Sequence, residues 1–203
     1  YVLGDAIARC REWHDAGHPL SVSVNISARD LCDDYLPYYV LQLLKEQELQ
    51  PNQLTLEVTE NSVMQQLGRA MTVLECLHDV GVRISMDDFG TGQSSLAQLR
   101  NMPLHELKID KSFVMALPDS VQDESIVRTT LELAHSLGLE VVAEGVENEE
   151  TLRFLSGSGC EHAQGFVLSK PIPPRKFLAW LQTFESVSYP DRRAALRPFR
   201  KEA

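Results

Sequence analysis

Hydrophobic residues along the chain follow two spacings in alternation. Apolar side chains three or four positions apart, as at Ala6, Cys10 and Trp13, are typical of one buried helix face. Between such stretches lie short runs that are continuously apolar or that alternate apolar with polar residues, and these runs predict strands. The predicted strands cover residues 21–27, 53–60, 82–89, 104–111, 140–147 and 162–169.

Three of the predicted helix-to-strand joints share one layout, a histidine followed three residues later by a glycine. Glycine suits the left-handed backbone just beyond a helix end, and a histidine in the last turn meets the negative end of the helix dipole. We therefore interpret these histidines as capping residues rather than as catalytic or metal-binding groups. The pairs are His14 and Gly17, His78 and Gly81, and His135 and Gly138.

Strands that alternate with helices predict an α/β fold with parallel strands joined by right-handed crossovers. Two architectures fit this order, an open doubly wound sheet and a (β/α)8-type barrel. The sequence has neither G-x-G-x-x-G nor G-x-x-x-x-G-K-[ST] after a predicted strand, so the usual signatures of nucleotide-binding open sheets are missing.

The composition narrows the class of protein. The chain has 203 residues, enough for one sizeable core, and no apolar run approaches the roughly 20 residues of a membrane helix. A formal net charge of -10 argues against binding to the backbone of a nucleic-acid polymer. The four cysteines form no C-x-x-C pair, which favours reduced thiols in a cytoplasmic domain.

Each predicted strand carries polar residues near its carboxyl end, where parallel α/β folds place their active sites. Several of them, such as Glu57 and Lys108, interrupt otherwise apolar runs, and a buried unpaired charge is costly. A cap or a solvated loop explains one such residue but not the whole series. The residues are Asn25, Ser27, Glu57, Glu60, Asp87, Asp88, Lys108, Asp110, Glu144, Glu147 and Gln164.

The chemistry of this set favours a metal centre. Carboxylates that converge on one rim repel one another unless cations lie between them, and hard oxygen donors select Mg²⁺, Mn²⁺ or Ca²⁺. At a strand end the second residue of the Asp87-Asp88 pair can turn inward, so that one carboxylate bridges two ions. Two such ions activate water and stabilise the leaving oxygen of a phosphoester, and Lys108 would balance the developing charge or orient the water.

Six motifs in order along the chain closely resemble the EAL-domain family. They read SVNIS, LEVTE, DDFGTGQSSL, LKID, VAEGVE and QGFVLSKP, and the likeness extends to about Phe184. The resemblance implies a modified (β/α)8 TIM-type barrel. It also implies a bacterial signalling enzyme, a cyclic di-GMP phosphodiesterase that uses Mg²⁺ or Mn²⁺ to open its substrate to linear pGpG.

The resemblance also assigns metal ligands. It implies that Asn25, Glu57 and Asp87 bind a first ion, and that Asp87, Asp88 and Glu144 serve a second. Glu144 has in addition been considered a general base in this family. The resemblance further implies that Ca²⁺ occupies such a site but inhibits turnover.

Other residues receive supporting or substrate-binding roles from the same resemblance. Lys108 would contact the catalytic water or the phosphate, and Gln164 would line the substrate site. Glu60 would anchor the loop that follows the aspartate pair, while Asp110 and Glu147 would support the site from behind.

Two departures from the family pattern stand out. Gln93 replaces the usual tyrosine of the loop after the aspartates, which affects a segment that the family uses for dimer contacts and substrate coupling. The Glu-x-Leu-x-Arg motif, which supplies a metal ligand and a phosphate contact, is absent and would lie upstream of Tyr1. A (β/α)8 barrel needs about 250 residues, so we expect an N-terminally incomplete barrel with about six of eight strands.

The expected domain organisation is a barrel domain over residues 1–185 followed by a basic tail or linker over 186–203. The resemblance implies cyclic di-GMP as the ligand, an upstream sensory or GGDEF domain, and a possible homodimer, in a cytoplasmic or membrane-attached parent protein. The alternative to an enzyme is a catalytically inactive module that binds cyclic di-GMP and signals to a partner. The missing motif leaves this alternative open for the chain itself.

Overall fold

The computed structural model describes residues 1–90 and 96–186 and contains, within them, one six-stranded parallel sheet. Neighbouring strands follow one another in chain order, so each crossover leads to the adjacent strand. This arrangement is that of a barrel and not of a doubly wound sheet, whose strand order reverses. The strands are β1 (Val22–Asn25), β2 (Leu54–Thr59), β3 (Arg83–Phe89), β4 (Glu106–Ile109), β5 (Glu140–Glu144) and β6 (His162–Gln164).

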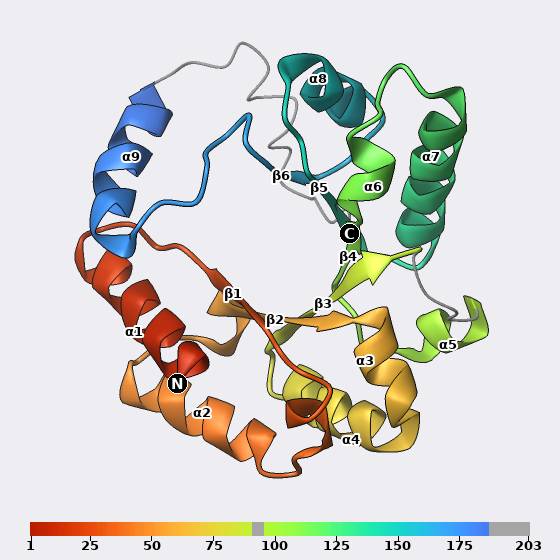
Figure 1. Cartoon of the computed structure of the whole chain (residues 1–203). Coiled ribbons are helices and arrows are strands. Elements are labelled where there is room, and N and C mark those ends of the chain that lie inside the picture. Colours follow the sequence, from red (N-terminus) through yellow and green to blue (C-terminus); the bar gives the residue numbers. More distant parts are fainter. Residues whose placement is uncertain (91–95, 187–203) are drawn as a thin grey trace, which may run out of the picture.

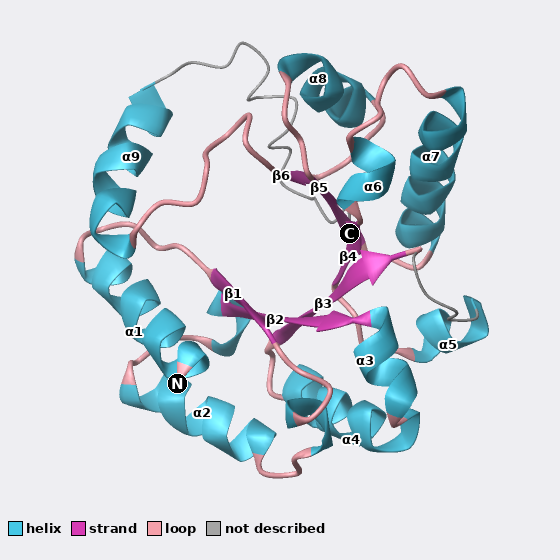
Figure 2. Cartoon of the chain, viewed as in Figure 1, coloured by secondary structure: helices cyan, strands magenta, loops and turns pink. Residues whose placement is uncertain are grey.

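Helices surround the outside of the curved sheet (Figures 1 and 2). None of those within the described residues combines the length and the hydropathy that a membrane span requires. The α-helices are α1 (Val2–Asp15), α2 (Leu36–Glu46), α3 (Glu60–Gln65), α4 (Leu67–Asp79), α5 (Leu96–Asn101), α6 (Lys111–Val114), α7 (Val121–Ser136), α8 (Glu149–Gly157) and α9 (Pro174–Ser186), with 3₁₀ turns η1 (Asp30–Cys32) and η2 (Pro51–Gln53).

The two faces of the sheet differ in chemistry because side chains alternate along each strand. On β2, Leu54, Leu56 and Val58 face the helices and belong to the main hydrophobic core. The alternate residues Thr55 and Glu57 face the concave side of the sheet, where polar side chains of the other strands gather. The helices therefore supply the packing, and the concave face is left for polar chemistry.

The sequence predicts the six strands and their parallel pairing correctly, but every strand except β3 ends earlier than expected, most clearly β4, β5 and β6. After β5 the chain turns at Gly145, whose φ of +70° is left-handed. After β4, Asp110 accepts a hydrogen bond from the Ser112 amide and so begins α6. After β6 the chain passes close to Val146: a Cβ at Gly165 would lie 2.1 Å from the Val146 carbonyl oxygen, and the Val167 amide donates a hydrogen bond to that oxygen.

Strands β1 and β6 form the two edges of the described sheet, and each has one hydrogen-bonded neighbour strand within it. The last turn of α1 meets the first turn of α9 (Figure 1), where Trp13 packs against Phe177 with ring centroids 4.5 Å apart. The expected basic tail falls almost wholly within residues 187–203, outside the described residues.

Candidate active site

The ammonium group of Lys108 lies at the centre of three carboxylates on the concave face. Its Nζ atom is 2.6 Å from Glu144 Oε1, 2.9 Å from Glu57 Oε2 and 3.3 Å from Asp87 Oδ1. The Lys108 side chain is only 3% exposed. We call these four residues the Lys108 cluster. Four neighbouring strands, β2 to β5, each contribute one member, which explains why residues 87 positions apart in the sequence meet here.

A local irregularity of β3 brings a fourth carboxylate to this site. The pairing register of β3 with β4 shifts between Met86 and Phe89, and Asp88 has a left-handed φ of 55°. Such a bulge turns a side chain that would otherwise point to the opposite face. As a result, carboxylate oxygens of Asp87, Asp88 and Glu144 all lie within 4.8 Å of one another. The prediction that the second aspartate turns inward is consistent with this geometry.

The electrostatics of the Lys108 cluster follow from its burial and its excess of acids. Burial disfavours the charged form of Lys108, but hydrogen bonds to Glu144 and Glu57 and the charges of Glu57 and Asp87 outweigh this and raise its pKa. Burial also raises the pKa of Glu144, helped by the charges of Asp87 and Glu57 and opposed by Lys108. Lys108 is therefore a cation at neutral pH and acts as a hydrogen-bond donor.

The pKa values of Asp88 and Asp110 shift in opposite directions although both residues lie at this rim. Burial raises the pKa of Asp88, and the charges of Asp87 and Asp110 add to the effect. Burial acts on Asp110 in the same sense, but hydrogen bonds from the side chain and backbone of Ser112 prevail and lower its pKa. Asp110 thus caps α6, and the supporting role expected for it remains a prediction.

The donor set at this rim fits a hard divalent cation. Asp87, Asp88 and Glu144 offer carboxylate oxygens close enough to share an ion, and Glu57 adds a fourth nearby carboxylate. Lys108 supplies one positive charge among them, so it provides part of the cationic charge that the sequence led us to expect entirely from metal ions. An excess of buried negative charge remains, and ions would relieve it.

The remaining predicted site residues occupy different positions around this centre. Asn25 is the register partner of Glu57 on β1, and Gln164 is the register partner of Glu144 on β6, so both flank the Lys108 cluster. Glu60 is buried at the start of α3, while Glu147 is exposed before α8.

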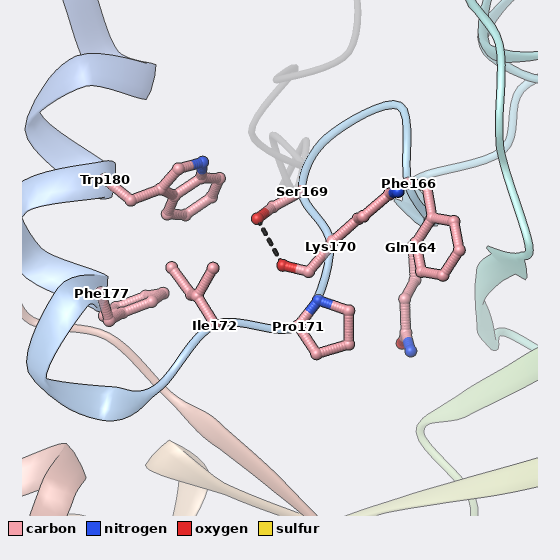
Figure 3. A pocket seen from close by; sticks show the side chains of 9 residues that line it. Gln164, Phe166, Ser169, Lys170, Pro171, Ile172, Phe177 and Trp180 are labelled. Carbon is pink, nitrogen blue, oxygen red and sulfur yellow. Dashed lines mark hydrogen bonds between the residues drawn. The ribbon is translucent and has the colours of Figure 1, made fainter.

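Beside Gln164 lies a pocket of about 380 Å³, formed by the segment after β6 and by α9 (Figure 3). Trp180, Phe177 and Ile172 form its apolar wall. On the side of Gln164, the ammonium of Lys170 lies 5.7 Å from the centroid of the Phe166 ring. The pocket therefore places an aromatic ring and an ammonium group next to Gln164, the residue at the end of β6 that borders the carboxylates.

Comparison with known proteins agrees with the motif order. Residues 1–171 match the family described as EAL domain. The chain belongs to the EAL-domain family. The signaling protein YkoW of Bacillus subtilis is 43% identical over 87% of the chain and 22% of its own length. The cyclic di-GMP phosphodiesterase NbdA of Pseudomonas aeruginosa is 40% identical over 96% of the chain and 25% of its own length.

A solved structure described as the PaMucR phosphodiesterase in complex with c-di-GMP is 41% identical, with a TM-score of 0.82. The match covers 87% of the chain and 72% of that structure. The barrel predicted from the sequence is therefore the fold of this EAL domain. The chain spans about a quarter of the length of the two curated relatives named above.

Some predictions about this EAL domain concern residues outside the described ranges. Gln93 lies in the segment 91–95, as does most of the loop that Glu60 is expected to anchor.

The three histidines at helix ends all make contacts away from the Lys108 cluster. His14 Nε2 lies 2.7 Å from the Leu20 carbonyl, His135 Nε2 lies 3.0 Å from Glu161, and the His78 ring packs against His105.

Sequence reasoning missed a second polar group at the amino ends of the strands. Arg83 donates a hydrogen bond to Glu140, and His162 Nε2 lies 3.8 Å from the same carboxylate oxygen. Glu106 lies next to them, and we call these four residues the Arg83 cluster. Polar residues on the same side of these strands could have signalled a polar concave face: Arg83 and Glu140 lie four positions before Asp87 and Glu144, and Glu106 lies two before Lys108. The pairing of Arg83 with Glu140 could not have been deduced from spacing.

Proposed function

We propose that this EAL domain hydrolyses one phosphodiester bond of cyclic di-GMP to give linear pGpG. The observation that carries the proposal is the convergence of Glu57, Asp87 and Glu144 on Lys108, with Asp88 turned toward the same rim. The names of similar proteins support the substrate, since one is a cyclic di-GMP phosphodiesterase and another is a phosphodiesterase in complex with c-di-GMP.

The acidic residues of the rim would hold Mg²⁺ or Mn²⁺. Asn25, Glu57 and Asp87 would hold one ion, and Asp87, Asp88 and Glu144 a second. When bound, such ions supply an activated water and stabilise negative charge on the phosphate oxygens. The left-handed backbone at Asp88 would let adjacent aspartates serve the same centre.

The other side chains would handle charge, protons and the substrate. Lys108 holds its proton tightly, so it would stabilise phosphate charge as a donor rather than act as a base. Glu144, whose pKa burial raises, would be the better proton acceptor of the two. Gln164 would orient the dinucleotide, and the Phe166 and Lys170 rim offers a face for a base and a charge for a phosphate.

Hydrolysis of cyclic di-GMP by the full-length protein tests this proposal. We expect pGpG as the product with Mg²⁺ or Mn²⁺, loss of turnover with a chelator, and little turnover with Ca²⁺. Glu57→Ala should lose turnover chiefly through loss of bound ion. Tight binding of cyclic di-GMP without any pGpG would favour the alternative function, a sensor module, and would overturn the enzyme assignment.

The full-length protein is expected to contain further domains beside this EAL domain. Relatives about four times as long as the match indicate further domains, and we propose an upstream sensory or GGDEF domain. We also propose residues 1–185 as the barrel domain, residues 186–203 as a tail or linker, and a homodimer as the assembly. Size-exclusion chromatography with light scattering tests the last of these.

A further inference from the structure

The Lys108 ammonium uses the same carboxylates that the proposed function assigns to divalent ions. It contacts Glu57, Asp87 and Glu144 at 2.9, 3.3 and 2.6 Å. Two of these contacts, those to Glu57 and Glu144, are hydrogen bonds that use donors of the ammonium. The carboxylate oxygens that face Lys108 are therefore already engaged by a cation that belongs to the chain.

A divalent ion and the ammonium cannot both keep full contact with this set. Carboxylate oxygens bind Mg²⁺ at about 2.0–2.1 Å, so an ion held by Glu57 and Asp87 would lie within a few ångströms of Nζ. Repulsion between two cations at such a separation is strong in a site that is nearly closed to solvent, where Lys108 is 3% exposed. One of the two must give up contacts.

The ammonium is the group that can move. Lysine carries a compact charge at the end of a flexible stem of four methylene groups, whereas the carboxylates are fixed to adjacent strands. Asp87, Asp88 and Glu144 already lie together without a rearrangement of the backbone. Ion binding can therefore proceed by a change in the Lys108 side chain alone.

We propose that Lys108 is an internal cation that competes with divalent ions for Glu57, Asp87 and Glu144, and that ion binding displaces its ammonium from Glu57 and Asp87. This inference deepens the proposed function and rests on its assignment of the metal ligands. It makes Lys108 a regulator of ion affinity as well as a phosphate-binding group. A displaced ammonium would be free to contact an anionic substrate, so ion and substrate binding would be coupled.

Calorimetric titration of the full-length protein with Mn²⁺ tests the competition. Lys108→Met removes the charge and keeps an unbranched apolar side chain. We expect this variant to bind Mn²⁺ at least about tenfold more tightly than the wild type. Lys111→Met is the matched control, because Lys111 is an exposed lysine three residues further along and its loss changes the net charge equally. We expect the control to stay within about twofold of the wild type.

Equal or weaker Mn²⁺ binding by Lys108→Met would overturn the proposal. If that variant folds poorly without ions, the wild type provides a second measurement. The ammonium signal of a buried, hydrogen-bonded lysine can be followed by nitrogen NMR, and Lys108→Arg identifies it by removing it. We expect the signal to shift or vanish as Mg²⁺ saturates the site. An unchanged signal at saturation would refute displacement.

The outcomes also separate this inference from the proposed function. Hydrolysis that depends on Mn²⁺, together with equal Mn²⁺ affinity in wild type and Lys108→Met, would overturn only the competition. Failure of both proteins to bind Mn²⁺ would overturn the ligand assignment and the competition together. Binding by Lys108→Met at concentrations where the wild type stays empty would give the strongest support.

Discussion

The two polar clusters on the concave face contain similar residues in a different balance. In the Lys108 cluster one ammonium meets three carboxylates, and the four side chains are between 3% and 18% exposed. In the Arg83 cluster the guanidinium pairs with Glu140, and these two side chains are 29% and 39% exposed. Both clusters include residues of β3, β4 and β5, so the strands that carry them do not by themselves distinguish the two clusters.

The difference teaches which polar group to assign a function. A paired and solvated charge is ordinary, and it contributes little to stability. Buried carboxylates in excess over the available cation are costly, and a fold retains them only when another contribution offsets the cost. The oxygen and nitrogen atoms of Glu106, Glu140 and His162 also lie within 4.8 Å of one another, but Arg83 already binds Glu140. This contrast is why the proposed ions are assigned to the Lys108 cluster and not to the Arg83 cluster.

The largest contrast between the clusters should appear in catalysis. Asp87→Asn keeps the shape of the side chain but removes the carboxylate proposed to bridge both ions. We expect turnover of cyclic di-GMP to fall by about a thousandfold or more. Glu140→Gln, the same change of chemistry in the Arg83 cluster, should leave turnover within about twofold. Comparable losses in the two variants would remove the distinction between the clusters.

Stability should respond more strongly to the lysine than to any change in the Arg83 cluster. Lys108→Met leaves three carboxylates without their cation in a buried site, which should cost about 3 kcal/mol of unfolding free energy. Urea denaturation in the presence of a chelator measures the loss. Saturating Mn²⁺ should restore most of it, because ions replace the missing charge. If Lys108→Met is as stable as the wild type in the presence of the chelator, the three carboxylates do not need the ammonium of Lys108.

The pH dependence of stability should reveal the strained carboxylates. Burial and the charges of Asp87 and Glu57 raise the pKa of Glu144, so the folded protein holds this proton to higher pH than the unfolded chain. The stability linked to Glu144 is therefore greatest below its ordinary pKa of 4.5, and falls as pH rises toward the folded value. In Glu144→Gln the unfolding free energy, measured by urea denaturation in the presence of a chelator, should fall less steeply with pH. If the unfolding free energy of the variant falls with pH as steeply as that of the wild type, the pH dependence does not come from Glu144.

Much of this site could be predicted from the sequence because the strands reveal it locally. Glu57, Asp87, Lys108 and Glu144 each interrupt an apolar run, and parallel strands bring their carboxyl ends to one rim. The inward turn of Asp88 was also foreseeable, since a strand end permits it. Local pattern therefore sufficed to find the strands, whereas their order in the sheet followed from the family resemblance.

The contacts that decide the chemistry could not be predicted in the same way. That Lys108 reaches three carboxylates depends on distances across four strands. The close approach of Gly165 to the Val146 backbone, just after β6, joins two segments that follow different strands. Arg83 and Glu140 are 57 residues apart and pair only because the sheet curves. Each of these features is set by tertiary geometry, for which hydrophobic spacing carries no signal.

The smallest effect should come from breaking the Arg83 cluster itself. Arg83→Met removes the partner of Glu140, but both side chains are accessible to water, which can solvate the remaining carboxylate. We expect a loss of less than about 1 kcal/mol in urea denaturation, further reduced by salt. Mn²⁺ affinity of the full-length protein should stay within about twofold of the wild type. If Arg83→Met loses as much unfolding free energy as Lys108→Met, the Arg83 cluster depends on its cation as strongly as the Lys108 cluster does. The excess of buried charge would then no longer explain why one cluster is proposed to bind ions and the other is not.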